Sequence, residues 1–202
     1  MRSLDRARFL PADQVSHARE DRALPLFHGQ TGSQPSTVAA MLRLLQVPVG
    51  ARVLDVGSGS GWSTALLARL VGPTGEVLGL ELDPDLCAFG AANLAAWDMP
   101  WAHIEQADAA HLGRPVDGGW DRILVSASPH VLPAELVDQL AVEGRMVVPV
   151  WTTMTLVVRP ADGPPVVTRH GEYVFVPLRT GSPPAASPPA ARRDQGGPRG
   201  RR

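Results

Sequence analysis

The sequence Arg52-Val-Leu-Asp-Val56, followed at once by Gly57-Ser-Gly-Ser-Gly61, decides the fold of this chain. The first five residues are mostly apolar, as in a short buried strand. The three alternating glycines let the backbone turn sharply and let a ligand approach the backbone amides. We expect a helix from Trp62 to about Val71, whose N-terminus faces the loop. Strand, glycine loop and helix in this order are typical of nucleotide-binding α/β domains.

The alternation of strands and helices continues on both sides of this stretch. We expect further strands over residues 76–81, 101–105, 121–126 and 145–150, and helices over residues 11–19, 36–45, 84–96 and 133–140. Two last strands, over residues 154–159 and 172–176, read as an antiparallel pair. Because strands that alternate with helices form right-handed βαβ units, the predicted fold is α/β. It is a doubly wound, mostly parallel, seven-stranded Rossmann-like sheet with an antiparallel C-terminal strand pair.

The composition excludes several kinds of chemistry. All 19 basic residues are arginine, so a phosphate-binding lysine and Schiff-base chemistry are excluded. The single Cys87 excludes an internal disulfide and any CxxC site for a metal or for redox chemistry. No apolar run approaches the roughly 20 residues that cross a bilayer, and the N-terminus does not read as a secretory signal. We therefore expect a cytoplasmic protein.

Charge divides the 202 residues into a body and a tail. Residues 180–202 are dominated by Pro, Gly, Ala and Ser and carry a charge of +4, so we predict a disordered tail. Its arginines could contact nucleic acid or a membrane, but the tail has no aromatic residues on which bases could stack, which favours a solvated extension. Residues 1–179 carry a charge of −5, which argues against nucleic acid as the substrate. We expect a monomer with neither a nucleic-acid nor a membrane partner.

Three acidic residues lie at the ends of successive predicted strands. Asp55 precedes the glycine loop, where a carboxylate repels a pyrophosphate and suits a cationic amino acid. Glu81 ends the second strand, where it can accept hydrogen bonds from both ribose hydroxyls. Asp108 follows the third strand, where it could hold an adenine amino group. Because Trp62 also breaks the GxGxxG pattern of dinucleotide sites, the pattern favours S-adenosylmethionine over NAD as the cofactor.

Several segments resemble one enzyme family. Gly29-Gln-Thr-Gly-Ser-Gln-Pro35 is similar to the GQTISQP signature of protein-L-isoaspartate O-methyltransferases, and Arg22-Ala-Leu-Pro25 resembles their DRPLP lead-in. Residues 121–129, 132–140 and 144–149 fit that family in order, and Phe175-Val-Pro-Leu178 resembles its closing strand. The resemblance covers roughly residues 9–179. It implies that residues 1–179 form a class I S-adenosylmethionine-dependent methyltransferase domain, with residues 1–30 as a segment on the substrate side.

The resemblance also implies a role for individual residues. Ser33 matches the active-site serine, and it binds substrate together with Val176 and Pro177. From the residues themselves we expect no metal site, because His103 and His111 are not at ligand spacing with any other His or Cys. The residues implied in cofactor binding are Gln30, Thr31, Gly32, Asp55, Gly57, Ser58, Gly59, Gly61, Glu81, Leu82, Asp108 and Ala109.

The reaction implied by the resemblance is methyl transfer from S-adenosylmethionine to the side carboxylate of L-isoaspartyl residues in damaged proteins or peptides, which starts repair through a succinimide. Such a carboxylate has a pKa of about 4 and is ionised at pH 7, so it needs no general base. Ser33 would donate a hydrogen bond that orients it. This fits a sequence in which we find no convincing His or Lys base.

Departures from the family pattern leave other functions open. Gly32 stands where the family usually has isoleucine, which removes an apolar wall beside Ser33. The N-terminal segment is shorter by about one helix, and Glu143 replaces the more frequent glycine. One alternative is an aspartyl O-methyltransferase that modifies a biosynthetic precursor peptide. Another is a catalytically weak domain that binds S-adenosylmethionine as an interaction module.

Three residues near the signature have a second interpretation. Ser33 could simply cap the helix that begins near Ser36. His28 could contact substrate or lie at the surface, and Trp62 could pack in the core or stack on a ligand. Only the spatial arrangement separates these interpretations.

Overall fold

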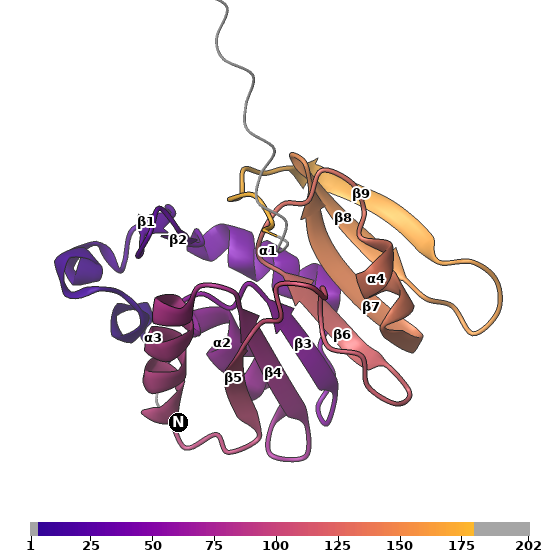
Figure 1. Ribbon diagram of the computed structural model, residues 1–202, viewed down its shortest axis with the longest axis horizontal. Coiled ribbons are helices and arrows are strands. Elements are labelled where there is room, and N and C mark those ends of the chain that lie inside the picture. The colour runs from indigo at the N-terminus through magenta and orange to yellow at the C-terminus, as the bar shows by residue number, and fades with distance from the viewer. Residues whose placement is uncertain (1–3, 180–202) are drawn as a thin grey trace, which may run out of the picture.

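Seven strands form the central sheet of the computed structural model, which describes residues 4–179 (Figure 1). The strands are β3 (Arg52–Val56), β4 (Glu76–Glu81), β5 (Ala102–Gln106), β6 (Trp120–Val125), β7 (Leu140–Val150), β8 (Thr153–Val158) and β9 (Val166–Glu172). Their order in the sheet is β5-β4-β3-β6-β7-β8-β9. The first five strands of this order run parallel, whereas β8 is antiparallel to both of its neighbours. The predicted sheet, with an antiparallel pair at its C-terminal end, is confirmed.

Helices cover the two faces of the sheet unequally. Three helices, α1 (Pro35–Leu45), α2 (Trp62–Val71) and α3 (Pro84–Ala95), share one apolar core with Val53 of β3. The short helix α4 (Ala134–Asp138) covers the opposite face, above Leu54. Because successive side chains of a strand point to opposite faces, Val53 and Leu54 enter different cores. Burial on both faces explains why these strands read as continuous apolar runs.

The chain enters this sheet through an irregular N-terminal segment. The helix predicted over residues 11–19 is a 3-10 helix, η2 (Ala12–His17), and a second one, η1 (Arg6–Phe9), precedes it. Two short strands, β1 (Leu24–Pro25) and β2 (Thr31–Gly32), then pair antiparallel. Residues 24–32, which we call the N-terminal hairpin, lie apart from the main sheet in Figure 1. Both tip residues, His28 and Gly29, have positive φ, which is typical of a type I′ hairpin turn.

The prediction of the last strand was wrong. We expected it over residues 172–176, but β9 spans Val166–Glu172 at the edge of the sheet. Most side chains of β9 are exposed, so this strand lacks the buried alternation by which a strand is recognised in a sequence. Residues 175–178, which resemble a closing strand, belong to no strand, and an isolated bridge joins Pro177 to Ser128.

Two other expectations concern the ends of the chain and membranes. The predicted tail, residues 180–202, lies outside the described residues, so the division at residue 179 stays a prediction. Within residues 4–179, no helix has the length and apolar character needed to span a bilayer.

Candidate active site

A cavity of about 860 Å³ opens at the carboxyl ends of the parallel strands. The chain leaves β3 toward β4 and β5 on one side of the sheet and returns through β6 on the other, so this edge is the switch point where α/β proteins bind ligands. Most residues that the sequence assigned to the cofactor and the substrate line this cavity. They are Gln30, Thr31, Gly57, Gly59, Glu81, Leu82, Asp108, Ala109, Val176 and Pro177.

The remaining predicted residues lie close by but not in this lining. Gly32, Ser33 and Ser58 line a smaller cavity of about 40 Å³. The two cavities share Leu26, Thr31, Gly57, Gly59 and Ser126 in their walls, so they adjoin each other. Asp55 and Gly61 line neither cavity. Asp55 contacts α2 instead, and Gly61 contacts α3.

The glycine loop ties the ends of β3 and β4 together. Gly57 and Gly59 have φ values of 76° and 54°, a region that glycine enters without strain. The amides of Gly57 and Ser58 both donate to the carbonyl oxygen of Leu80, at 2.8 and 3.0 Å. The loop therefore turns over the end of β4 and presents its glycines to the large cavity.

Gly61 packs against α3 rather than facing the cavity. A Cβ atom at Gly61 would lie 2.8 Å from the carbonyl oxygen of Gly90, and one at Gly90 would lie 2.5 Å from the carbonyl oxygen of Gly59. Two glycines thus allow the helix to touch the loop. Asn93 strengthens this contact by donating from Nδ2 to the carbonyl oxygen of Ser60 at 3.0 Å.

Glu81 is held by backbone amides on both sides. Glu81 is 8% exposed, and its carboxylate accepts hydrogen bonds from the amides of Gly59 at 2.8 Å and Asp83 at 3.0 Å. An ionised carboxylate has about four acceptor positions, so capacity remains for a ligand in the cavity that Glu81 lines. This fixed acceptor at the end of β4 is suited to a pair of hydroxyl groups.

Asp55 lies behind the loop and is fully buried. Its Oδ2 atom accepts hydrogen bonds from the hydroxyls of Ser63 and Thr64, both at 2.7 Å. Burial raises the pKa of Asp55 to about 6, against the hydrogen bonds that lower it. Its Oδ1 atom and the hydroxyl of Ser58 have no hydrogen-bond partner in the described part of the chain. Buried polar atoms without a partner are rare, which marks this end of the loop as a place for a ligand's polar group.

Ser33 has a free side chain beside the loop. Helix α1 begins at Pro35 with Gln34 as its N-cap residue, and the amide of Ser36 is capped by Asp21 Oδ1 at 2.8 Å. The Ser33 hydroxyl makes no hydrogen bond to any described residue, so the interpretation of Ser33 as a helix cap is wrong. Its position in the small cavity leaves the hydroxyl free for a bound molecule.

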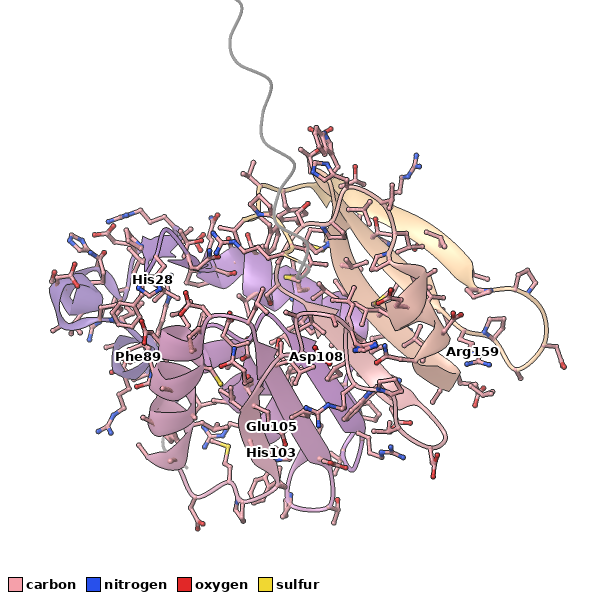
Figure 2. The ribbon with its side chains drawn as sticks, viewed as in Figure 1. His28, Phe89, His103, Glu105, Asp108 and Arg159 are labelled. Atoms are coloured by element: carbon pink, nitrogen blue, oxygen red, sulfur yellow. The ribbon has the colours of Figure 1, made fainter. Side chains whose placement is uncertain are left out.

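The far side of the large cavity is built from two loops. Asp108, labelled in Figure 2, accepts hydrogen bonds from the amide of Ala110 at 2.8 Å and from His111 Nδ1 at 2.9 Å. The bond from the Ala110 amide is the main reason that the pKa of Asp108 is lowered. Near the C-terminus, the amide of Ser128 donates to the carbonyl oxygen of Val176 at 2.8 Å, which fixes the segment containing Val176 and Pro177 at the cavity wall.

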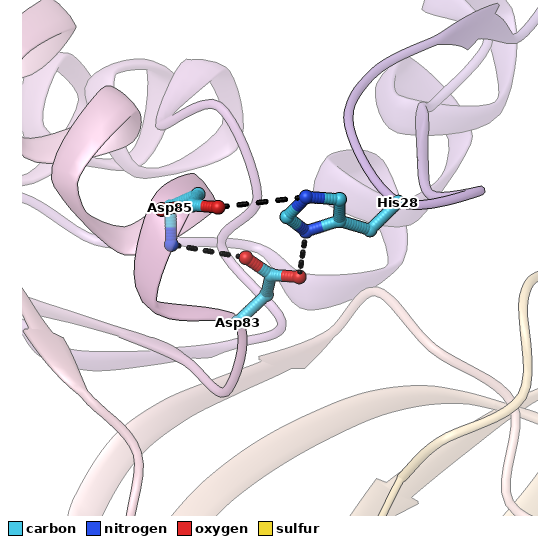
Figure 3. Close-up of side chains that lie close together, drawn as sticks. All are labelled: His28, Asp83 and Asp85. Carbon is cyan, nitrogen blue, oxygen red and sulfur yellow. Dashed lines mark hydrogen bonds and ion pairs between the residues drawn. The ribbon is translucent and has the colours of Figure 1, made fainter.

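The tip of the N-terminal hairpin reaches the start of α3. His28 Nδ1 lies 2.6 Å from Asp83 Oδ2, and its Nε2 lies 3.4 Å from Asp85 Oδ2 (Figure 3). The hydrogen bond to Asp83 raises the pKa of His28. Phe27 packs edge-on against Phe89, with ring centroids 5.1 Å apart. His28, whose role the sequence left open, therefore bridges the hairpin and the helix that follows Glu81.

Arg6 is a residue of the site that the sequence did not single out. Its side chain is buried, and Arg6 lines the small cavity together with Ser33. Its guanidinium donates hydrogen bonds to backbone carbonyl oxygens. Because every residue has a backbone carbonyl, the residue types of these partners do not reveal the contact. No sequence pattern distinguishes Arg6 from the other arginines of the chain.

Comparison with known proteins agrees with this geometry. The sequence model of the family Protein-L-isoaspartate(D-aspartate) O-methyltransferase matches residues 1–182. A protein-L-isoaspartate O-methyltransferase of Anaeromyxobacter dehalogenans is 45% identical over 189 residues, which cover 90% of this chain and 88% of the relative. One of Aeropyrum pernix is 39% identical over 182 residues, which cover 88% of this chain and 70% of the relative.

A solved structure also has a fold similar to that of this chain. It is described as a protein-L-isoaspartate O-methyltransferase of Plasmodium falciparum in complex with S-adenosyl-L-homocysteine. It is 28% identical to this chain, with a TM-score of 0.72, and the match covers 87% of this chain and 86% of the other. Fold, site and relatives agree, and the chain belongs to the protein-L-isoaspartate O-methyltransferase family.

Proposed function

We propose that this chain transfers the methyl group of S-adenosylmethionine to the side carboxylate of L-isoaspartyl residues in damaged proteins and peptides. One observation carries the proposal beyond the family assignment. Ser33, whose hydroxyl makes no hydrogen bond to a described residue, lines a small cavity beside the large cavity at the carboxyl edge of the sheet. The two cavities share five residues in their walls, namely Leu26, Thr31, Gly57, Gly59 and Ser126. This arrangement supports a role for Ser33 in orienting a substrate carboxylate beside the cofactor.

The large cavity suits S-adenosylmethionine in size and in chemistry. Its volume of about 860 Å³ falls in the usual range of ligand sites. Glu81 would accept the ribose hydroxyls, and Asp108 and Ala109 would lie at the adenine. Ser58, whose hydroxyl has no hydrogen-bond partner among the described residues, would lie at the amino-acid end, and Gln30 and Thr31 would close the cavity from the N-terminal hairpin.

The residues of the chain orient and shield the reacting groups. S-adenosylmethionine supplies, when bound, a methyl carbon that its sulfonium sulfur activates. The substrate carboxylate is ionised at neutral pH, so no residue has to remove a proton. Ser33 donates a hydrogen bond that orients the carboxylate, and Val176 and Pro177 hold the substrate main chain. Correct placement of reacting atoms about 3 Å apart is itself a large part of catalysis.

The methyl ester then leads to repair without further help from the chain. The methoxy group of an ester leaves far more readily than the oxygen of a carboxylate. The neighbouring amide nitrogen therefore attacks the ester carbonyl carbon and closes a succinimide, and the methoxy group leaves with the amide proton as methanol. Hydrolysis of that ring returns part of the material to the normal aspartyl linkage.

The proposal includes the setting of the reaction. We place the enzyme in the cytoplasm as a monomer that acts on proteins and peptides, not on nucleic acid or membranes. The single Cys87, which forms no internal disulfide, and the charge of −5 on residues 1–179 support this setting.

Paired peptides that differ only in an aspartyl or isoaspartyl linkage test the proposed function. We expect the chain to form a methyl ester on the isoaspartyl peptide and none above background on the aspartyl peptide. Turnover of the aspartyl form of one particular peptide would instead support an enzyme that modifies a precursor. Calorimetric binding of S-adenosylhomocysteine without turnover of either peptide would support an interaction module.

A further inference from the structure

We propose that Arg6 is a positioning residue for methyl transfer, because its buried guanidinium holds the backbone at Ser33 and so sets where the serine hydroxyl meets the substrate carboxylate. The inference rests on the proposed function and deepens it. It concerns a residue of η1 whose guanidinium contacts backbone carbonyl oxygens and the ring of Trp62.

The guanidinium of Arg6 joins three segments of the chain. Each terminal nitrogen donates to more than one carbonyl oxygen, an arrangement that the flat fork of an arginine allows. One nitrogen reaches the residues between η2 and β1, and the other reaches both those residues and the signature segment. The acceptors are the carbonyl oxygens of Glu20 (3.0 Å), Ala18 (3.5 Å), Arg22 (2.9 Å), Ser33 (3.0 Å) and Gly32 (3.4 Å).

The burial of this charge is unusual. Arg6 is 6% exposed, and within residues 4–179 no carboxylate lies within ion-pair distance of it. Burial lowers the pKa of Arg6, although Asp21 opposes this effect from a distance. Removing a charge from water is costly unless hydrogen bonds replace its hydration. Here hydrogen bonds to backbone carbonyls replace the water around the guanidinium. These bonds also hold the loops that carry the carbonyls in place.

The other side of the guanidinium faces the cofactor loop. Its central carbon lies 5.3 Å from the ring centroid of Trp62, within the range of a cation–π contact. Trp62 is the first residue of α2, directly after Gly61 of the glycine loop. Arg6 thus contacts both the segment that carries Ser33 and the helix that follows the cofactor loop. Arg6, Ser33 and Trp62 all line the 40 Å³ cavity.

This bridge matters because Ser33 lies between two elements. Strand β2 ends at Gly32 and α1 begins at Pro35, so neither element fixes Ser33 directly. A misplacement of about 1 Å at a reacting centre can cost about 100-fold in rate. Arg6 bonds to the Ser33 carbonyl and also contacts Trp62 of α2. It therefore sets the distance between the Ser33 hydroxyl and the cofactor loop.

Three variants test the inference by steady-state methylation of an isoaspartyl peptide and by calorimetry with S-adenosylhomocysteine. In Arg6→Lys the charge remains but the fork is lost, so we expect kcat to fall about 10- to 100-fold. The KM for the peptide and the Kd for S-adenosylhomocysteine should stay within about threefold, since the guanidinium of Arg6 is bonded to backbone carbonyl oxygens and Arg6 lies outside the lining of the large cavity. Arg8→Ala is the matched control: Arg8 is an exposed arginine of the same 3-10 helix, stacked over Trp97, and its loss should leave kcat within about twofold.

Arg6→Ala adds a readout that a purely structural role would not move. Millimolar guanidinium ion should restore part of its kcat by occupying the vacated site, whereas ammonium ion should not. If Arg6→Ala does not fold, Arg6→Lys decides the matter alone.

Wild-type kcat in Arg6→Lys would overturn the inference. So would a loss of kcat matched by an equal loss of cofactor affinity, or a folded Arg6→Ala that guanidinium does not rescue. The wild-type chain in the same assay separates this result from the proposed function. If the wild type forms no ester on the isoaspartyl peptide, the proposed function is wrong, and the inference about Arg6 is wrong with it.

Discussion

Ser33 is the residue whose hydroxyl meets the substrate in the proposed reaction. A hydrogen bond to a charged group is worth about 1.5–3 kcal/mol, so Ser33→Ala should lower kcat about 10- to 100-fold. The Kd for S-adenosylhomocysteine should stay within about twofold, because Ser33 lies outside the lining of the large cavity. Methyl-ester formation measures the rate, and Ser16→Ala, an exposed serine of the same N-terminal segment, is the control. An unchanged kcat would remove Ser33 from the mechanism.

Asp55 makes the stability of the fold depend on pH. Burial raises its pKa from 3.8 to about 6, so between these values the folded state holds more protons than the unfolded state. The free energy of unfolding therefore falls as pH rises through this window. The stabilisation is complete below about pH 3.8 and is lost above about pH 6. Since one pKa unit corresponds to about 1.4 kcal/mol, the loss amounts to about 3 kcal/mol.

The variant Asp55→Asn removes this titration while keeping an acceptor for Ser63 and Thr64. We expect its free energy of unfolding at pH 7.5 to exceed that of the wild type by about 1–3 kcal/mol. Urea unfolding at about pH 4.5 and pH 7.5 measures the difference, with the exposed Asp138→Asn as control. Parallel pH curves for the wild type and Asp55→Asn would contradict this account of Asp55.

At the scale of elements, the contact between α3 and the glycine loop depends on Gly90. A methyl group there would lie 2.5 Å from the carbonyl oxygen of Gly59, a backbone atom that cannot rotate away. Gly90→Ala should therefore displace the loop, lower the free energy of unfolding by about 1–3 kcal/mol and weaken S-adenosylhomocysteine binding more than tenfold. Calorimetry and urea unfolding give both values, and Ala92→Ser on the exposed side of α3 is the control. Wild-type cofactor affinity in Gly90→Ala would show that the loop does not need this close contact.

The N-terminal hairpin is tied to α3 by an interaction that titrates. The hydrogen bond to Asp83 raises the pKa of His28, so the ion pair is at full strength below the ordinary pKa of histidine and is lost as pH rises through the raised value. Because His28 is exposed, we expect an effect on the hairpin and not on the whole fold. Between about pH 6 and pH 8.5, S-adenosylhomocysteine binding to the wild type should weaken about two- to fivefold more than binding to His28→Ala. Calorimetry at both pH values measures the Kd for S-adenosylhomocysteine, with His103→Ala as the control. Equal changes of this Kd in the wild type and in His28→Ala would show that the His28–Asp83 interaction does not affect cofactor binding.

The elements that the sequence predicted best are those buried on both faces. Strands β3 and β4 were predicted with their correct ends, because a buried parallel strand is a short apolar run between turn residues. The start of α3 followed from Asp83, whose side chain caps the helix, and from Pro84. The edge strand β9 was misplaced because its exposed side chains carry no such pattern.

For the molecule as a whole, the sequence predicted which residues gather at the carboxyl edge but not how each one acts. Glu81 and Ser33 lie beside cavities, as the strand ends and the signature implied. Asp55 faces away from the cavity because side chains alternate along β3, and its neighbours on α2 take its hydrogen bonds. The contacts of Arg6 and His28 join residues far apart in the sequence, and no local pattern encodes them.

The most direct test of the central claim is calorimetric titration of S-adenosylhomocysteine into the wild type and Glu81→Gln. If the large cavity holds the cofactor with Glu81 at its sugar, the wild type binds one equivalent and Glu81→Gln binds about 10- to 100-fold more weakly, as expected for a lost charged hydrogen bond. Glu105→Gln, on the neighbouring strand β5 and outside the cavity lining, should bind like the wild type. Equal affinity in Glu81→Gln and the wild type, or no binding to the wild type, would contradict the claim.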